Sequence, residues 1–166
     1  MSEGLQIHAG QAGATSPLVR TTELILDKAY TEKAIEFIKD AKSEIMLCAY
    51  AWRWYSNEPE IGIQKFNIEL KKAQMRGVTV RCILNNETMA SYFATLGFKT
   101  LAVQPTRMMH TKALLIDSRT LILGSHNFTK RANTDNYEAS IATQEPEACM
   151  QFQEYFDRLW VACAHC

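Results

Sequence analysis

Residues 109–130 read MHTKALLIDSRTLILGSHNFTK, two apolar runs into which polar residues are set at fixed spacing. The runs HTKALLID and TLILGS predict two β-strands joined by a short turn, so the stretch is expected to form a hairpin. Residues two apart in a strand point to one face, which places His110 and Lys112 together. Because the hairpin folds back, Ser125 and Asn127 at the end of the second strand lie beside them. The stretch therefore predicts a cluster of four polar side chains at one edge of a sheet.

The four side chains of this cluster have complementary chemistry. His110 supplies an imidazole that can act as a nucleophile or carry a proton, and Lys112 supplies a fixed cation. Cations and aimed N–H donors, such as the amide of Asn127, stabilise a phosphorus centre whose oxygens gain charge. No carboxylate lies among the four, which argues against a magnesium site, and we expect no metal and no cofactor. Glu138, on the next predicted strand, is the candidate to accept the other imidazole N–H.

The rest of the chain alternates strand and helix signals. Apolar residues at helical spacing, such as Ile63, Phe66 and Leu70, predict amphipathic helices, while the run EIMLCAYAW is typical of a strand buried on both faces. The predicted strands are 23–26, 44–52, 78–84, 99–103, 110–117, 120–125 and 137–143. The predicted helices are 30–42, 61–77, 87–97 and 146–160. Strands separated by helices favour parallel pairing, so the predicted fold class is α/β, a mixed and mostly parallel sheet with helices on both faces.

Length and composition fit one compact domain. The chain has 166 residues, of which 47% are hydrophobic and 22% charged, enough for one core and too few for two. Residues 22–166 are expected to form this domain. Residues 1–21 are rich in Gly, Ala, Ser and Thr without periodicity, and we interpret them as an arm that is either mobile or docked on a protein partner. Because no signal peptide or transmembrane apolar run occurs, we predict a cytoplasmic protein without a transmembrane segment.

Charge and cysteine content exclude few partners. Eighteen basic residues balance eighteen acidic ones, so no overall charge attracts the chain to nucleic acid or to an acidic membrane, although a local basic cleft remains compatible with this balance. Five cysteines, an odd number, favour reduced thiols over a disulfide framework. The tail CAHC brings Cys163, His165 and Cys166 together, but three ligands at cramped spacing favour a frayed helix end over a zinc site.

The polar residues of the hairpin form a sequence motif that rarely occurs by chance when all of its positions are present. His-x-Lys is followed by an aspartate five positions after the lysine, and then by Gly-Ser-x-Asn. This string resembles the signature of the phospholipase D superfamily, and all six of its positions are present: His110, Lys112, Asp117, Gly124, Ser125 and Asn127. The resemblance extends from about Glu23 to Trp160. It implies an α/β/α sandwich with phosphodiesterase activity.

The resemblance is strongest to short bacterial endonucleases of this superfamily, which carry one motif per chain. The stretch GSHNFTKRANTDNYEA is similar to their second motif segment followed by a glutamate that orients the nucleophile, here Glu138. Asp117 lies at the turn, on the opposite strand face from the histidine, and it is expected to be structural, as is Gly124. The chain differs in lacking the export signal of some of these nucleases, in its N-terminal arm and in the aromatic segment YAWRWY. These differences leave substrate and location open.

Enzymes of this superfamily use two His-x-Lys motifs in one site. Of the four histidines in this chain, only His110 is followed two positions later by a lysine. A homodimer supplies the motif twice across a twofold axis, so the resemblance implies a shared site. In the implied metal-independent mechanism, one His110 attacks phosphorus to form a phosphohistidine, the other protonates the leaving oxygen, and water completes hydrolysis. Lys112 and Asn127 would hold the phosphate oxygens, with Ser125 nearby.

Several residues around the motif have two readings each. Trp52, Trp54 and Tyr55 lie at or just after the end of a predicted strand. Their rings either stack unpaired bases, with Arg53 on phosphate, or bury in the core or in a dimer interface. Basic residues on both sides of the motif either rim a substrate cleft or are ordinary surface charges; they are Arg107, Lys130 and Arg131. His126 alternates away from its neighbours and is expected to pack inside, whereas His8 and His165 carry no functional prediction.

Three functions remain as hypotheses from the sequence. The leading one is a homodimeric nuclease that hydrolyses DNA or RNA without metal and with little sequence preference. The second is a lipid phosphodiesterase of the phospholipase D type, for which the aromatic segment would contact a membrane surface. The third is the nuclease or binding subunit of a larger assembly, activated by a protein partner through residues 1–21. The neutral net charge fits this third hypothesis better than it fits a free, indiscriminate nuclease.

Overall fold

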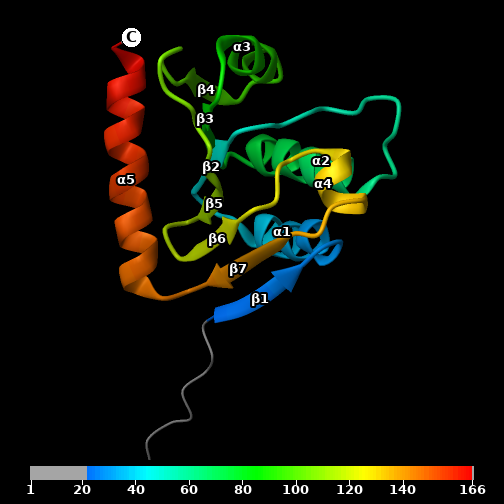
Figure 1. The fold of residues 1–166 in the computed structure, drawn as a ribbon. Helices are drawn as coiled ribbons and strands as arrows, with labels where there is room; N and C mark the ends of the chain where they lie inside the picture. Colours follow the sequence, from blue (N-terminus) through cyan, green and yellow to red (C-terminus); the bar gives the residue numbers. More distant parts are fainter. Residues whose placement is uncertain (1–21, 166) are drawn as a thin grey trace, which may run out of the picture.

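The computed structural model describes residues 22–165, and this part of the chain is built on a seven-stranded sheet with the order β1-β7-β6-β5-β2-β3-β4 (Figure 1). The strands are β1 (Thr22–Leu26), β2 (Glu44–Ala49), β3 (Thr79–Leu84), β4 (Lys99–Ala102), β5 (Lys112–Ile116), β6 (Thr120–Gly124) and β7 (Ala139–Thr143). The N-terminal arm predicted for residues 1–21 lies outside the described residues. The strands β5 and β6 pair as the hairpin that the sequence predicts.

Helices cover both faces of this sheet. They are α1 (Ala29–Asp40), α2 (Gly62–Met75), α3 (Glu87–Thr95), α4 (Lys130–Thr134) and α5 (Pro146–Ala164). In Figure 1, α1 and α2 lie on one side of the sheet and α5 on the other. The α/β class with helices on both faces is therefore confirmed.

The strand directions differ from the prediction of a mostly parallel sheet. Only β2, β3 and β4 run parallel to one another, and the pairs β1–β7, β7–β6, β6–β5 and β5–β2 are antiparallel. The reason is the connection between β4 and β5, which contains no helix and spans residues 103–111. Without a crossover helix, the chain stays at the end of the sheet where β4 finishes, and β5 starts there beside β2. β5 therefore runs opposite to β4 and to β2.

The sheet separates two apolar clusters, and β5 contributes to both. Leu114 and Ile116 pack in the cluster under α1 and α2, whereas Ala113 and Leu115 pack in the cluster under α5. This burial on both faces explains why the strand is apolar at nearly every position. The only polar residue of β5 is Lys112, at its first position.

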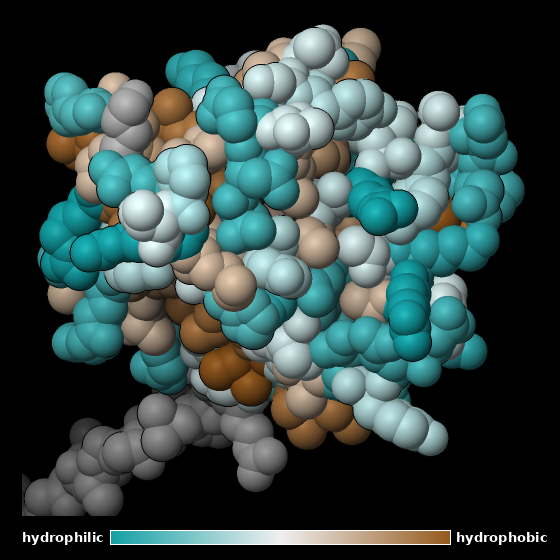
Figure 2. Space-filling model, turned by 45° about the horizontal axis from the view of Figure 1, so that its top comes forward, coloured by the Kyte–Doolittle hydropathy of each residue, from teal (hydrophilic) through white to brown (hydrophobic). Residues whose placement is uncertain are grey.

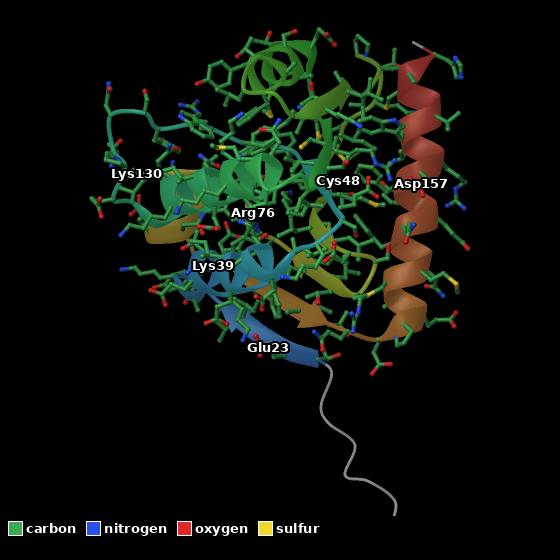
Figure 3. All side chains as sticks on the ribbon, turned by 180° about the vertical axis from the view of Figure 1, so that it is seen from behind. Glu23, Lys39, Cys48, Arg76, Lys130 and Asp157 are labelled. Atoms are coloured by element: carbon green, nitrogen blue, oxygen red, sulfur yellow. The ribbon has the colours of Figure 1, made fainter. Side chains whose placement is uncertain are left out.

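Arginines connect the helices to the rest of the fold. Arg76, just after α2, donates hydrogen bonds to the carbonyl oxygens of Ile38 and Lys39 at the end of α1 (Figure 3). On the other face, Arg81 of β3 donates to Glu44 of β2 and to Asp157 of α5. The Arg81 guanidinium also lies 5.1 Å from the ring centroid of Phe156. These contacts fix α5 across β3, β2 and their neighbours.

Asp117, in the turn between β5 and β6, holds the start of β2. Its carboxylate accepts hydrogen bonds from the backbone N–H groups of Lys42, Ser43 and Glu44 and from the Ser43 hydroxyl, at 2.8 to 3.0 Å. Partial burial acts to raise the pKa of this carboxyl, but the hydrogen bonds outweigh it and hold the pKa below its ordinary value. Its backbone has a φ of 51°, a conformation that Asp and Asn tolerate better than most residues.

We expect Asp117→Asn to lower the free energy of unfolding by about 1–2 kcal/mol at pH 7, because the amide keeps the shape but loses the charge and one acceptor. A carboxyl with a lowered folded-state pKa stabilises above its unfolded pKa of about 3.9 and loses this effect as pH falls through the folded pKa. The difference between wild type and variant in urea denaturation should therefore shrink below pH 4. The exposed Asp40→Asn is the matched control, and an equal loss in both variants would contradict the assignment.

Candidate active site

The polar motif lies at the sheet edge where β2 and β3 end and β5 and β7 begin. Lys112, the first residue of β5, pairs with Gly124, the last residue of β6. His110 stands two residues before Lys112 and is exposed. The preceding residue, Met109, is buried, and its N–H donates to the side-chain oxygen of Asn85 after β3 at 3.0 Å. This hydrogen bond fixes the backbone from which His110 projects.

His110, Lys112 and Tyr50 form one contact group. The Lys112 Nζ lies 3.1 Å from Nε2 and 3.3 Å from Nδ1 of the His110 ring. Tyr50, the residue after β2, meets the His110 ring edge-to-face at a centroid distance of 5.0 Å, and Lys112 Nζ lies 5.4 Å from its ring centroid. Because Nζ is at nearly the same distance from both ring nitrogens, the ammonium group contacts the ring as a whole, and the tautomer decides which nitrogen can accept from it. The group therefore places a cation directly beside the exposed imidazole.

Sequence reasoning missed Tyr50 in this group. The aromatic segment of residues 50–55 was recognised, but alternation along an isolated strand does not show which ring meets the motif. The available signal was position, because Tyr50 lies near the end of the strand predicted over 44–52, and sites in α/β sheets form at strand ends.

The charge of Lys112 is balanced by nearby groups. The side chain is buried, and burial lowers the pKa of Lys112, while the neighbouring carboxylate of Glu138 partly offsets this. A cation so placed retains little water and interacts strongly with any anion that approaches. A phosphate group is an anion that such a cation would bind.

Ser125 and Glu138 are joined to each other. The Ser125 hydroxyl donates to the Glu138 carboxylate and accepts from the backbone N–H of Ala139 at 3.1 Å. Glu138 also accepts from the side-chain amide of Asn136 at 2.9 Å. Within residues 22–165 these hydrogen bonds, rather than one from the His110 ring, occupy the carboxylate. Glu138 thus acts on the site through Lys112 and Ser125.

Asn127 has an unsatisfied side chain. Its Oδ1 is buried and has no hydrogen-bond partner among the residues that the structure describes. Its backbone carbonyl accepts from the Asn133 amide at 3.3 Å. Buried polar atoms are nearly always paired, and an exception costs about 1–3 kcal/mol. The side chain is therefore poised for a group from outside the chain.

Gly124 allows β6 and β7 to approach closely. A Cβ at this position would lie 2.1 Å from the Ser140 hydroxyl oxygen and 2.4 Å from the Ala139 carbonyl oxygen. The Ser140 hydroxyl could rotate away, but relief of the contact with the carbonyl oxygen would require the backbone of β7 to move. The glycine of the motif is thus explained by packing beside the site.

His126 is a packed residue, in the environment expected from alternation. It is fully buried, its Nδ1 lies 2.8 Å from the Ser140 hydroxyl and its Nε2 lies 2.9 Å from the Asp27 carbonyl oxygen. Its ring stacks on Tyr30 at a centroid distance of 4.5 Å. Burial lowers the pKa of His126, although the Asp27 carbonyl and nearby carboxylates act in the opposite direction.

The aromatic segment divides between core and surface. Trp52 is buried, stacks on Phe93 at a centroid distance of 3.6 Å and donates from Nε1 to Asn67 at 2.7 Å. Its ring is therefore unavailable to a substrate base, and the base-stacking reading is wrong for this residue because the core holds it. Trp54 is half-buried against the core, and Arg53 is exposed. Both remain candidates for substrate contact.

The three basic residues predicted to rim the site differ in how free their charges are to bind a substrate. Arg107 and Arg131 are exposed, whereas the ammonium group of Lys130 forms an ion pair with Glu58, whose hydrogen bond raises the pKa of Lys130. The Lys130 backbone N–H donates to the Tyr55 hydroxyl at 2.8 Å, so Tyr55 anchors the start of α4. Figure 3 shows Lys130 on the side of the sheet away from α5. Lys130 therefore offers less free charge to a substrate than the arginines do.

Residues 22–165 contain no group of three or more His, Cys, Asp or Glu side chains arranged to hold a metal ion. In the CAHC tail, Cys166 lies outside the described residues. Among the helices in the described part of the chain, none is both long and apolar enough to cross a membrane.

Residues 34–160 match the family described as "Cardiolipin synthase, PLD-like domain". The chain belongs to the phospholipase D-like family. This membership confirms the resemblance carried by the motif.

Relatives of this phospholipase D-like chain include hydrolases of lipids. It is 29% identical to a mitochondrial cardiolipin hydrolase of Danio rerio over 141 residues, which cover 78% of this chain and 56% of the relative. It is 31% identical to a phospholipase D of Rickettsia prowazekii over 100 residues, 54% of this chain and 47% of the relative. The chain thus spans about half the length of the relatives it matches.

Two solved structures share the fold of this chain. NucT from Helicobacter pylori superposes with a TM-score of 0.69 at 18% identity, covering 86% of this chain and 96% of NucT. Nuc from Salmonella typhimurium, a phospholipase D family member, also gives 0.69 at 22% identity, covering 84% and 94%. At these identities the likeness establishes the fold.

The burial of His126 predicts a pH-dependent stability. Since the unfolded imidazole titrates at about 6.5 and the folded one at a lowered pKa, the unfolded state binds more protons below pH 6.5, and stability falls as pH decreases. We expect His126→Asn to flatten this fall between pH 7.5 and 5.5 in urea denaturation, whatever its own cost at pH 7.5. His165→Asn, at an exposed site, should retain the wild-type slope. A wild-type slope in His126→Asn would refute the explanation.

Proposed function

We propose that this phospholipase D-like protein is a metal-independent phosphodiesterase that hydrolyses DNA or RNA with little sequence preference. The observation that carries the proposal is the contact between the His110 ring and the Lys112 ammonium group at an exposed sheet edge. Family membership supports phosphodiester chemistry at that edge. A cytoplasmic location stays a prediction from the sequence.

The proposed reaction has two displacements at phosphorus. A ring nitrogen of His110 attacks, a nitrogen–phosphorus bond forms, and the bond to the leaving oxygen breaks as the second histidine donates a proton to it. Water then attacks the phosphohistidine, gives its proton to the second histidine and releases His110. Lys112 and the Asn127 amide hold the non-bridging oxygens, on which charge accumulates.

The second histidine is proposed to come from a second copy of the chain. Each chain supplies a single His-x-Lys motif, and the reaction proposed above needs two histidines at one phosphorus atom. A twofold axis at this edge would bring His110 of both subunits to one phosphorus atom. On this proposal an isolated subunit is inactive.

Nucleic acid is the substrate that the site edge suits best. The exposed guanidinium groups of Arg53 and Arg107 lie on the segments that flank His110 in space and in sequence, and Arg131 is on α4. Such groups bind successive backbone phosphates without reading bases.

A lipid phosphodiester is the second candidate substrate. The names of the relatives, mitochondrial cardiolipin hydrolase and phospholipase D, favour it. The half-buried ring of Trp54 and the exposed ring of Tyr92 line one hollow beside the end of β2, which offers a small apolar contact for an acyl chain. Activation by a protein partner through residues 1–21 is the remaining alternative.

A substrate panel in excess EDTA decides among these functions. Wild type, His110→Ala and the control His165→Ala should be incubated with single-stranded DNA, duplex DNA, RNA, and vesicles of cardiolipin or phosphatidylcholine. We expect wild type and control to cleave nucleic acid, and His110→Ala to lose at least about 1,000-fold in rate because the nucleophile is absent.

The outcomes of this panel are distinct. Cleavage of cardiolipin alone would establish the lipid candidate in place of the nuclease. An absolute need for a divalent ion would refute the metal-independent mechanism. Inactivity of the wild type on every substrate would favour activation by a partner.

Subunit mixing tests the shared site. Wild type and His110→Ala are unfolded together in equal amounts, refolded and assayed against the same total amount of refolded wild type. If each site needs both histidines, only dimers of two wild-type chains act, and total activity falls to about one quarter of that of an equal total of wild type, instead of about one half for independent sites. A value near one half would contradict the shared site.

A further inference from the structure

Two segments that are distant in the sequence enclose a hollow beside the candidate active site, here called the aromatic hollow. Its lining comes from residues 52–54, which follow β2, and from residues 86–93, which include the N-cap and most of α3. Figure 1 shows both segments at the end of the sheet where β2 and β3 finish. The hollow holds about 370 Å³, within the range of about 300–1,000 Å³ that small-ligand sites occupy. It is therefore large enough to receive a small ligand.

Aromatic rings line much of the aromatic hollow. Trp52 and Phe93 belong to the buried core and stack on each other at a centroid distance of 3.6 Å. Trp54 is half-buried against the same core, and Tyr92 is 46% exposed, so both rings present surface to a ligand. A planar aromatic group stacks on flat rings of this kind. The lining thus favours a flat, aromatic ligand.

The backbone around Trp54 is held in place by α2. The Arg53 carbonyl oxygen accepts from the side-chain amide of Asn67 at 2.9 Å. The Tyr55 N–H donates to the side-chain oxygen of Gln64 at 2.8 Å. Asn67 also donates to Gln64 at 2.9 Å, and both residues are buried. A ring that projects from such a fixed backbone loses little conformational freedom when a ligand stacks on it.

Both segments that line the aromatic hollow are bonded to the segments that carry the motif. The Arg53 N–H donates to the carbonyl oxygen of Phe128, which directly follows the motif, at 3.0 Å. On the other side, the Asn85 side chain accepts from the N–H of Met109, the residue before His110. The hollow therefore lies next to the edge at which a phosphate group would meet His110.

The polar groups of the aromatic hollow suit a nucleotide. Among the lining residues Arg53 carries the charge, and its exposed guanidinium can bind a backbone phosphate. Asn86 and Thr88, both exposed, add an amide and a hydroxyl. Because Asn86 Oδ1 caps α3 by accepting from the Met89 N–H at 2.9 Å, its amide N–H groups remain as donors for the edge of a base. A cation beside open aromatic rings is the combination that binds unpaired strands.

The acyl chain of a membrane lipid fits this surface less well. In Figure 2 the α3 end of the molecule is turned toward the viewer, and the hydrophobic residues of this face lie in small separate groups among hydrophilic ones. Docking on a membrane favours a continuous apolar area instead. A base is therefore the better occupant of the aromatic hollow.

We propose that the aromatic hollow binds an unpaired base of a strand whose phosphodiester lies at His110, with the rings of Trp54 and Tyr92 in contact with the base. Arg53 binds a neighbouring phosphate of the same strand. This inference rests on the proposed nuclease function and adds a base-binding subsite to it. A base in a duplex must first be unpaired and unstacked to enter, which costs free energy. Single strands are therefore expected to bind more tightly than duplexes of the same length.

Binding of oligonucleotides tests the aromatic hollow without catalysis. The His110→Ala background prevents cleavage during the measurement. Dissociation constants are measured by fluorescence anisotropy at fixed salt for a single-stranded thymidine oligonucleotide and for an abasic oligonucleotide of the same length, which keeps every phosphate but lacks the bases. We expect the thymidine strand to bind about tenfold more tightly than the abasic strand, because only the former can stack on the hollow.

Variants of the lining should remove this preference. In the same background, Trp54→Ala and Tyr92→Ala should each raise the dissociation constant of the thymidine strand about tenfold and leave that of the abasic strand unchanged. Trp54→Phe keeps an aromatic ring and should retain most of the preference. Trp160→Ala is the matched control, because Trp160 is also half-buried but lies on α5, and it should leave both constants unchanged.

Three outcomes would overturn the base-binding subsite. Equal binding of the thymidine and abasic strands would show that no base is bound. An equal loss of affinity for both strands in Trp54→Ala and Tyr92→Ala would show that these rings only support the structure. Weaker binding of the two variants to cardiolipin vesicles, with unchanged binding to both strands, would assign the hollow to an acyl chain. Circular dichroism and thermal melts check folding, and the exposed Tyr92 provides a test that does not disturb the core.

Failure of this inference is distinguishable from failure of the proposed function. A thymidine preference that depends on Trp54, together with no cleavage of nucleic acid by the wild type, would retain the aromatic hollow and reject the nuclease. Cleavage of single strands by the wild type at a rate that Trp54→Ala and Tyr92→Ala leave unchanged would retain the nuclease and reject the hollow.

Discussion

The pairing of β5 with β2 on one side and β6 on the other is the constraint on which the rest of the structure depends. Because no helix separates β4 from β5, β5 starts at the same end of the sheet where β4 finishes. It therefore pairs antiparallel to β2. This direction brings His110 to the end of β2, where Tyr50 stands. Asp117, at the far end of β5, fixes the start of β2 through four hydrogen bonds and thereby supports the same register.

Beneath the site the residues are tightly packed, whereas at its surface a buried cation and an amide oxygen without a hydrogen-bond partner lie close to the motif. Packing against β7 explains both Gly124 and His126. At Gly124 one added carbon would collide with β7, and the His126 ring contacts the Ser140 hydroxyl of the same strand. Lys112 is buried but still balanced by Glu138, while the Oδ1 of Asn127 has no partner among the described residues. An unpaired acceptor of this kind costs stability and is satisfied only by a hydrogen-bond donor. The buried cation of Lys112 is the feature of this edge that agrees with an anionic substrate.

The sequence by itself determined the α/β class, the hairpin and the positions of His110 and Lys112, because these follow from periodicity and short-range spacing. It did not determine strand direction, the burial of Trp52 or the partners of Glu138. Only the tertiary structure decided these, since each depends on which distant segments meet: β2 with β5, residue 52 with α2 and α3, and residue 125 with β7. Local sequence patterns specify to which face of a strand or helix a side chain points. Contacts between distant segments decide which residues pack against that face.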